Sequence, residues 1–308
     1  MPTETPTPLP TSSPAPIVLA GATGALGLLI AHHLRRRGAT VRALVRPLSS
    51  TGAEAESLRL QGVEVVPVEY SSVVALKQAC TGASCVISAL SGLRDIIVDT
   101  QTRLLNAAVA AGVPRFIPSD FSADFTKLPE GSNRNFDLRR EFQRRLDKAP
   151  IQATSILNGM FTDLLTGQAP VVLTGPHRVL YWGDADQLLD FTTMVNTADY
   201  TAAAALDATT PRYLRVAGQV ASIRQLREEA SAALGKEFKL FRAGSLGFLA
   251  TMIKITRTLA PAHDEVFPPW QGMQYLHNML SGQAKLAEPL ANARYPDIRW
   301  TPVREVLG

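Results

Sequence analysis

A glycine-rich turn between a strand and a helix is the feature that most narrows what this 308-residue chain can fold into. The apolar run IVLA at 17–20 is followed directly by GATGALG, with glycines at 21, 24 and 27, and then by the helix-like ALGLLIAHHLRRRG. Glycines in this position let backbone N–H groups and a helix N-terminus approach a pyrophosphate. The pattern predicts a nucleotide-binding βαβ unit, and the alternative is a purely structural turn.

The same alternation continues along the first half of the chain. Strand-like VRALV, GVEVVPV, SCVISAL and PRFIPS are separated by helix-like segments such as VVALKQAC and TRLLNAAVAAG. Strands that alternate with helices of this length predict an α/β fold with a parallel sheet covered on both faces. Farther along, IQATSILNG is typical of a sixth strand, and Ser222 with Gln225 forms a capping-box pattern before a helix that Gly235 ends.

This pattern divides the chain into three parts. Residues 1–16, rich in Pro, Thr and Ser, are expected to be a disordered tail. Residues 17–157 form the expected nucleotide-binding domain, and 158–308 a smaller, mainly substrate-binding portion. The two are interleaved, because a helix within about 190–207 is expected to return to the sheet. The stretch from 244 to 308 is expected to build a lid or pocket wall.

Composition and charge exclude several classes of function. The net charge is only +4, and the arginine runs near 35–37 and 139–145 fall in helix-like segments, so no nucleic-acid partner is expected. Two cysteines and five histidines show no metal-ligand spacing, so we expect no metal. No apolar run approaches the roughly 20 residues that span a bilayer, and the N-terminus lacks the regions of a signal peptide. We therefore expect a soluble cytoplasmic monomer or homodimer with a small-molecule substrate.

The residue after the second strand bears on which nucleotide is bound. An NAD-selective protein usually carries Asp or Glu there to hold the ribose 2′-hydroxyl, whereas this chain has Arg46. A guanidinium suits a 2′-phosphate through charge-assisted hydrogen bonds, so NADP(H) is favoured. Arg42 on the same strand could assist. The alternative is that Arg46 is a surface residue before Pro47.

Several motifs, in this order, give the chain a family resemblance: GATGALG, LVRP, CVISALSG, AGVPRFIPSDF and RYPDIRW. Together they resemble the NmrA-like and isoflavone reductase-like group of atypical short-chain dehydrogenases. The resemblance implies a Rossmann-type doubly wound parallel sheet that binds NADP(H). It also implies one of two activities, reduction of small aromatic or phenylpropanoid compounds, or sensing of the nicotinamide redox state without catalysis.

Ligands of open parallel sheets lie beyond the carboxyl ends of the strands, so the residues after each strand are the candidate site. The expected cofactor-binding residues are Gly21, Thr23, Gly24, Ala25, Leu26, Gly27, Arg46, Ser88, Ala89, Leu90, Ser119, Phe121, Asn158 and Gly159. Met160, Phe161 and Tyr275 are expected to form an apolar substrate pocket. For each of these aromatic residues, ordinary core packing is the alternative.

The catalytic residues depart from both patterns that the resemblance brings to mind. No tyrosine here has the Tyr-xxx-Lys pair of ordinary short-chain dehydrogenases. Isoflavone reductase-like enzymes instead carry an acid/base lysine on the helix after PSDF, and the matching position is Arg139. With a pKa above about 12, arginine does not release a proton, but it can stabilise an oxyanion. Asp137 and Tyr275 are candidate proton donors, with a solvated helix residue and core packing as their alternatives.

The leading hypothesis is an NADPH-dependent reductase that transfers a hydride to a small aromatic or enone-like substrate, with Arg139 as its catalytic residue. The alternative from another class is a catalytically silent NADP(H)-binding redox sensor that acts through a protein partner. The missing lysine at position 139 motivates this second hypothesis. An epimerase or dehydratase that uses the same nucleotide is a third.

Overall fold

A computed structural model describes residues 15–167 and 169–308. The predicted tail lies outside this range except for residues 15 and 16. The centre is a six-stranded parallel sheet in the order β3-β2-β1-β4-β5-β6. Its strands are β1 (Ile17–Ala20), β2 (Val41–Val45), β3 (Glu64–Pro67), β4 (Cys85–Ser88), β5 (Arg115–Ile117) and β6 (Gln152–Ala153). Because the strand order reverses between β1 and β4, their carboxyl ends frame the crevice where such sheets bind ligands.

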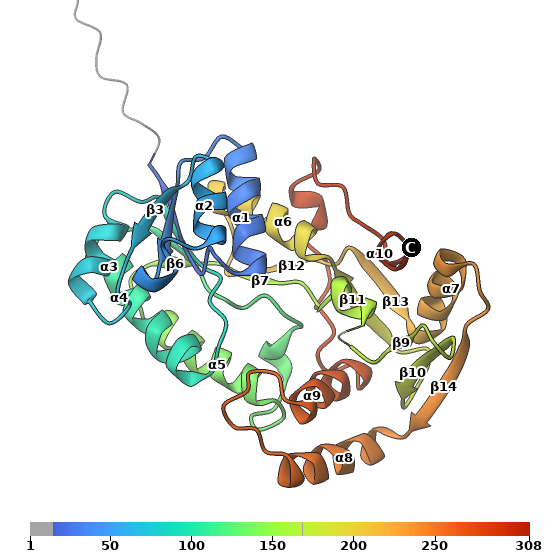
Figure 1. The fold of residues 1–308 in the computed structure, drawn as a ribbon. Helices are drawn as coiled ribbons and strands as arrows, with labels where there is room; N and C mark the ends of the chain where they lie inside the picture. Colours follow the sequence, from blue (N-terminus) through green and yellow to red (C-terminus); the bar gives the residue numbers. More distant parts are fainter. Residues whose placement is uncertain (1–14, 168) are drawn as a thin grey trace, which may run out of the picture.

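Helices cover both faces of this sheet (Figure 1). One layer contains α1 (Ala25–Arg36), α2 (Ala53–Leu60) and α6 (Met194–Leu206), whose apolar side chains share a core with Ile17 and Leu19 of β1. The other contains α3 (Val73–Cys80), α4 (Gln101–Ala110) and α5 (Arg134–Leu146), packed on Val18 and Phe116. Strands buried on both faces need continuous apolar runs, which explains IVLA and CVIS. The α/β prediction is confirmed.

One expected strand is divided in the structure. IQATSILNG forms β6 and then β7 (Ser155–Leu157), and β7 pairs with β12 (Tyr213–Arg215) rather than with the central sheet. The change of partner occurs at Thr154, whose amide still bonds the Phe116 carbonyl while the next amide bonds Arg212. The expectation of a single sixth strand was therefore wrong, because a distant segment supplies the pairing partner.

Besides α6 and β12, the described second half of the chain forms two further small sheets and the helices α7 to α10. One sheet contains β8 (Met160–Phe161), β11 (Leu188–Thr192) and β13 (Gln219–Ser222), and the other β9 (Val172–Leu173), β10 (Arg178–Trp182) and β14 (Lys239–Gly244). The helices are α7 (Ile223–Leu234), α8 (Leu246–Leu259), α9 (Pro269–Leu280) and α10 (Val303–Leu307). The predicted capping box at Ser222 and the left-handed Gly235 that ends α7 are both present.

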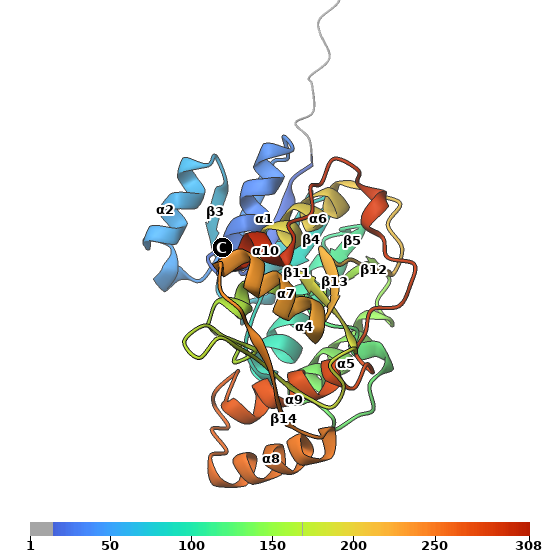
Figure 2. The ribbon, with the colours of Figure 1, turned by 90° about the vertical axis from the view of Figure 1, so that its right-hand side faces the viewer.

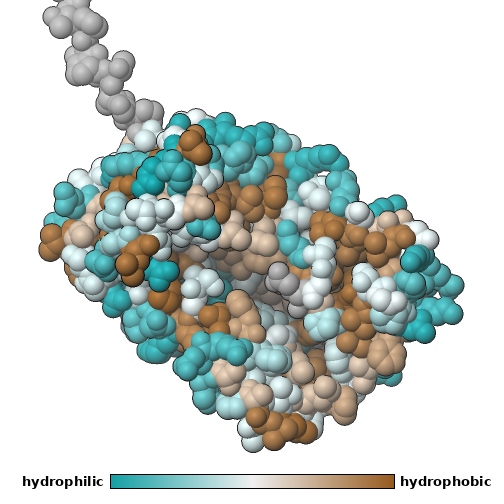
Figure 3. Space-filling model, in the orientation of Figure 1, coloured by the Kyte–Doolittle hydropathy of each residue, from teal (hydrophilic) through white to brown (hydrophobic). Residues whose placement is uncertain are grey.

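Two views place these parts relative to one another. Figure 2 shows α1 and α6 at one end of the molecule, α8 and α9 at the other, and α10 beside α7. In Figure 3 the surface is hollowed between the central-sheet part and the C-terminal part. Within the described residues, no helix combines the length and apolar character needed to cross a membrane.

Candidate cofactor and substrate site

The glycine turn after β1 is packed too closely for side chains at two of its three glycines. Gly21 has φ +78°, and a Cβ there would lie 2.5 Å from the Ala89 carbonyl oxygen. At Gly27 a Cβ would lie 2.1 Å from the Gly21 oxygen. Gly24 differs, since it is exposed, precedes α1 and has no comparable clash. The turn thus holds the first turn of α1 directly against the ends of β1 and β4.

The start of α1 offers unused hydrogen-bond donors. Among the described residues, the amides of Ala25, Leu26 and Gly27 have no backbone acceptor, and Gly24 supplies no side-chain cap. Free amides at a helix N-terminus attract anions, because the helix dipole adds to their hydrogen bonds. Together with the partly exposed Thr23, they suit a pyrophosphate.

Arg42 of β2 and Arg46, the residue after this strand, have different surroundings. Arg46 is exposed, and its guanidinium makes no hydrogen bond or ion pair to the rest of the described chain. Arg42 is tied down by Glu64 at 2.8 Å and by the carbonyls of Ala79 and Thr81. Arg42 therefore braces β2 against its neighbours and is not available to help Arg46 bind a 2′-phosphate.

The ends of β4 and β5 meet next to the glycine turn. The Ser119 hydroxyl donates to the Leu90 carbonyl at 2.6 Å, and the Ala89 amide bonds the carbonyl of Ala20. Ser88 is fully buried, and its hydroxyl has no partner among the described residues. Phe121 is buried in the core that lies between the sheet and α1. The predicted residues that follow β4 and β5 therefore lie close together.

The end of β7 contributes a second unsatisfied polar group. Asn158 is fully buried, yet neither its amide nitrogen nor its amide oxygen has a partner within the described structure. Its position is fixed because its main-chain amide bonds the Ser122 carbonyl, and its carbonyl accepts from Thr192 at 2.7 Å. Buried polar groups are almost always satisfied, so this amide has hydrogen bonds left for a ligand or for water. The donor set of the free α1 amides, Arg46, Ser88 and Asn158 fits NADP(H).

Helix α5 places Arg139 beside the residues that follow β5. Asn133 caps this helix by accepting from the amides of Asn135 and Phe136. One turn later Arg139 donates from Nε to the Ser119 carbonyl and from Nη1 to the Asn135 carbonyl, each at 3.2 Å. Its Nη2 has no partner among the described residues, and it forms no ion pair there. Two carbonyls thus hold a half-buried guanidinium that keeps free donors.

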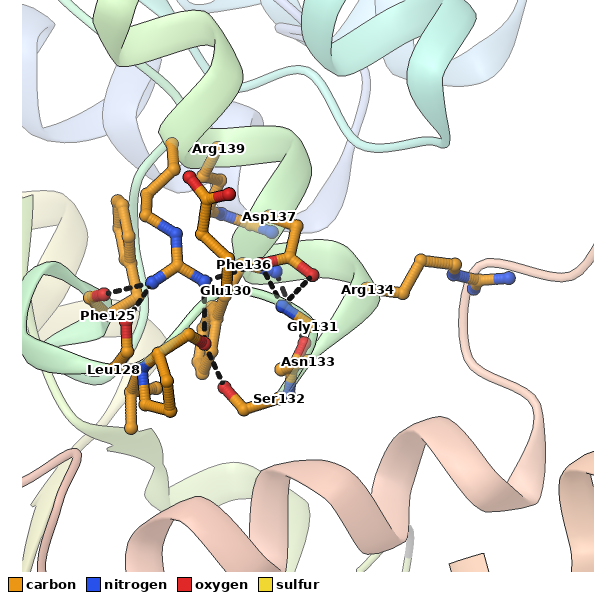
Figure 4. Close-up of polar contacts among 12 residues, drawn as sticks. Phe125, Leu128, Glu130, Gly131, Ser132, Asn133, Arg134, Phe136, Asp137 and Arg139 are labelled. Atoms are coloured by element: carbon orange, nitrogen blue, oxygen red, sulfur yellow. Dashed lines mark hydrogen bonds and ion pairs between the residues drawn. The ribbon is translucent and has the colours of Figure 1, made fainter. Parts of the chain in front are cut away.

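Asp137 serves the start of α5 rather than the site. Both of its carboxylate oxygens accept from the Gly131 amide, and Arg140 donates to it (Figure 4). Figure 4 also shows Arg134 pointing away from this group, toward the loop between α8 and α9, whose carbonyls it binds. Asp137 is therefore a half-buried residue whose carboxylate is bound by its own helix start, rather than the solvated helix residue that was its alternative.

The three expected substrate-binding residues are divided between two cores. Met160 and Tyr275 contact the core of the C-terminal portion, where the Tyr275 ring meets Phe136 of α5 edge-on at 4.9 Å. Phe161 packs against the core of the central sheet. Met160 and Phe161 form β8, directly after Asn158 and Gly159. Gly159 has φ +69°, and a Cβ there would lie 2.3 Å from the Asp190 carbonyl oxygen, so this close approach to β11 requires glycine.

One residue of the site was missed by sequence reasoning. Asp120 is fully buried, and burial is the main cause that raises its pKa above the ordinary value, while hydrogen bonds from Ser155 and Gln143 oppose the rise. The motif PSDF contains it, but an aspartate at a strand end is usually exposed. Nothing in the local pattern signals that this one is covered by α5 and β7.

The comparisons with known proteins agree with this geometry. The model of the NmrA-like family matches residues 14–259. The chain belongs to the NmrA-like family. A curated relative is the bifunctional pinoresinol-lariciresinol reductase of Linum album, 25% identical over 323 aligned residues that cover 97% of this chain and 95% of the relative.

Solved structures share this NmrA-like fold over nearly its whole length. One is AtPrR2 with NADP⁺ and (+)-pinoresinol, which has a TM-score of 0.78 at 22% identity and covers 95% of this chain and 97% of its own. Another is the NADPH-dependent quinone oxidoreductase QOR2 of Escherichia coli complexed with NADPH, with a TM-score of 0.73 at 20% identity and coverage of 94% and 98%. The likeness confirms the predicted doubly wound fold.

Proposed function

We propose that this NmrA-like protein is an NADPH-dependent reductase of small aromatic or enone-like substrates, and specifically of conjugated carbonyl compounds such as quinones. The observation that carries the proposal is the placement of Arg139, which is held by two carbonyls beside the strand ends and keeps unpaired N–H groups. The reductases among its relatives and structural neighbours support a redox activity. Bound NADPH would supply the hydride.

The cofactor would be held by the residues whose polar groups lack partners. The amides of Ala25, Leu26 and Gly27 would bind the pyrophosphate, and Arg46 the 2′-phosphate. Asn158, with one free donor and one free acceptor, matches a carboxamide. The remaining expected contacts would come from Gly21, Thr23, Gly24, Ser88, Ala89, Leu90, Ser119, Phe121 and Gly159.

The chemistry of arginine limits the reaction. Arg139 does not remove a proton from a substrate, so the substrate must be electrophilic without prior deprotonation. A conjugated carbonyl meets this condition, because hydride addition places the negative charge on its oxygen. The free Nη2 of Arg139 donates to that oxygen, and preorganised donors of this kind stabilise a developing oxyanion. Water then protonates the resulting phenolate or enolate.

The surroundings of the other candidate groups are consistent with Arg139 as the oxyanion donor and water as the proton donor. Asp137 is occupied by Gly131 and Arg140, which argues against a role as proton donor. Phe161, on the central-sheet side of β8, would give the substrate an apolar contact, whereas Met160 and Tyr275 on the other side pack in the core of the C-terminal portion.

The test measures NADPH oxidation with menadione and phenanthrenequinone as quinone probes and with pinoresinol as a non-quinone probe. We expect quinone reduction by the native protein and a loss of about 10²–10³ in kcat for Arg139→Gln, the usual effect of removing one oxyanion donor. Arg139→Lys keeps the charge and should retain part of the rate. Asp137→Asn is the matched control on the same helix and should leave kcat unchanged. Pinoresinol reduction without quinone reduction would refute the substrate class.

A second function, redox sensing without turnover, is favoured by one observation, the replacement of the family lysine by Arg139. In that case NADPH and NADP⁺ would bind with different affinities to two conformations, because equal affinity shifts no population. No probe would then be reduced, although NADPH binding measured by fluorescence would persist.

A further inference from the structure

Asp120 has one satisfied and one unsatisfied carboxylate oxygen in a fully buried position. Its Oδ2 accepts from Gln143 at 3.0 Å and from Ser155 at 2.6 Å. Its Oδ1 has no partner among the described residues. Asp120 takes no part in the reductase mechanism above, so its burial requires its own explanation.

Asp120 and Arg139 are connected through the same short turn and the same helix. Arg139 bonds the carbonyl of Ser119, the residue before Asp120. Gln143, which bonds the Asp120 carboxyl, lies four residues after Arg139 and therefore on the same face of α5. Helix α5 thus binds both residues of the Ser119–Asp120 pair, Ser119 through Arg139 and Asp120 through Gln143.

Three titratable groups face Asp120 from the elements packed against it. Arg139 comes from α5, Arg212 from the segment before β12, and Tyr213 from β12 itself. The charge of Arg212 is already balanced by Asp147 at 2.9 Å, and Arg212 reaches Asp120 only through the Ser155 hydroxyl. Arg139 has no ion pair in the described structure. The charge of Asp120 would therefore be felt mainly by Arg139.

We propose that Asp120 is a positioning residue whose protonation state sets how much of the Arg139 charge is available to a substrate oxyanion. This inference rests on the proposed function of Arg139. With Asp120 protonated, the guanidinium is electrostatically free to stabilise the oxyanion. With Asp120 ionised, the buried carboxylate attracts the same charge and competes with the substrate.

The direction of the pH effect follows from the surroundings of Asp120. Burial raises its pKa, so the protonated form persists to higher pH than for an exposed aspartate. The reductase should lose activity as pH rises through this ionisation.

The first experiment is the pH profile of kcat for phenanthrenequinone reduction. We expect the native profile to fall about tenfold toward high pH, and Asp120→Asn to abolish that fall, since asparagine still accepts from Ser155 and Gln143 but does not ionise. Asp137→Asn, which removes a carboxylate of the same helix that Gly131 and Arg140 bind, is the matched control and should retain the native profile. An unchanged profile in Asp120→Asn would overturn the proposal.

A second measurement does not depend on turnover. Infrared difference spectroscopy follows the C=O band of the protonated Asp120 carboxyl, assigned by its absence in Asp120→Asn or, if that variant does not fold, by its shift in Ser155→Ala. Because coupling between two sites is reciprocal, Arg139→Gln should raise the pH midpoint of this band. If no quinone is reduced but the midpoint moves, the proposed function fails and the coupling stands. If Arg139→Gln does not change the pH midpoint, the two groups are not coupled and the proposal is wrong.

Discussion

Replacing Arg46 by glutamate tests the assignment of the nucleotide most directly. Arg46 follows β2, and its carbonyl accepts from the Ser49 amide, which fixes the main chain, while the exposed guanidinium makes no hydrogen bond or ion pair with the described residues. Binding of a 2′-phosphate therefore breaks no existing interaction of this side chain. A carboxylate at position 46 would repel that phosphate and could accept from a ribose hydroxyl instead.

The expected magnitude follows from one charge-assisted hydrogen bond in an exposed setting. Such bonds contribute about 1.5–3 kcal/mol, which corresponds to a change in Kd of roughly 10–150-fold. The preference for NADPH over NADH should fall by that factor in Arg46→Glu. Because exposed charges are screened, the effect should shrink at high salt.

The assay is a calorimetric or fluorescence titration with NADPH, NADP⁺ and NADH. Arg42→Gln is the matched control, since Arg42 lies on β2, just before Arg46, but binds Glu64 and two carbonyls. It should lower the free energy of unfolding and leave the NADPH to NADH ratio of affinities unchanged. The reasoning is refuted if Arg46→Glu keeps the native preference or if Arg42→Gln alters it more. Should no nucleotide bind at all, the reductase and the sensor hypotheses fall together.

Three further predictions concern stability. Gly27→Ala should destabilise the unliganded protein by about 1–3 kcal/mol, because its Cβ would overlap the Gly21 oxygen. Gly24→Ala should keep the stability and weaken NADPH binding. Urea unfolding and NADPH titration of both variants check these two expectations. Asn133→Ala should lower the free energy of unfolding by about 2–4 kcal/mol, since the buried side chain caps α5 and also accepts from Gln271 of α9. An unfolding free energy within error of the native value would contradict this expectation. For Asp120 the folded pKa is raised, so its contribution to stability is full below the unfolded pKa of about 3.9 and is lost as pH rises through the folded value. Asp120→Asn should therefore gain stability relative to the native protein as pH rises, and a difference that is constant with pH in urea titrations would rule this out.

Local signals predicted the nucleotide-binding half of the fold closely. β1, the glycine turn and α1 were predicted because an apolar run, glycines at fixed spacing and an amphipathic stretch are adjacent in the chain. The capping box of Ser222 and Gln225 was readable for the same reason. Arg46 was placed at a strand end by its position after VRALV alone.

Residues whose surroundings come from distant parts of the chain were not predictable in this way. The division of the sixth strand at Thr154 depends on β12, about 60 residues farther along. Arg42 was predicted to assist Arg46 in phosphate binding, but Glu64 and the end of α3, both distant in the sequence, bind its guanidinium. The burial of Asp120 depends on α5 and β7.

The sequence by itself thus determined where the phosphate-binding turn lies, which residue follows β2, and that position 139 carries an arginine. These are properties of short segments, in which spacing and residue type decide the local structure. Only the tertiary structure decided which polar groups have no partner among the described residues, as at Ser88, Asn158 and Nη2 of Arg139. Whether a polar group is satisfied depends on every segment that packs around it, and that information is not contained in any one of them.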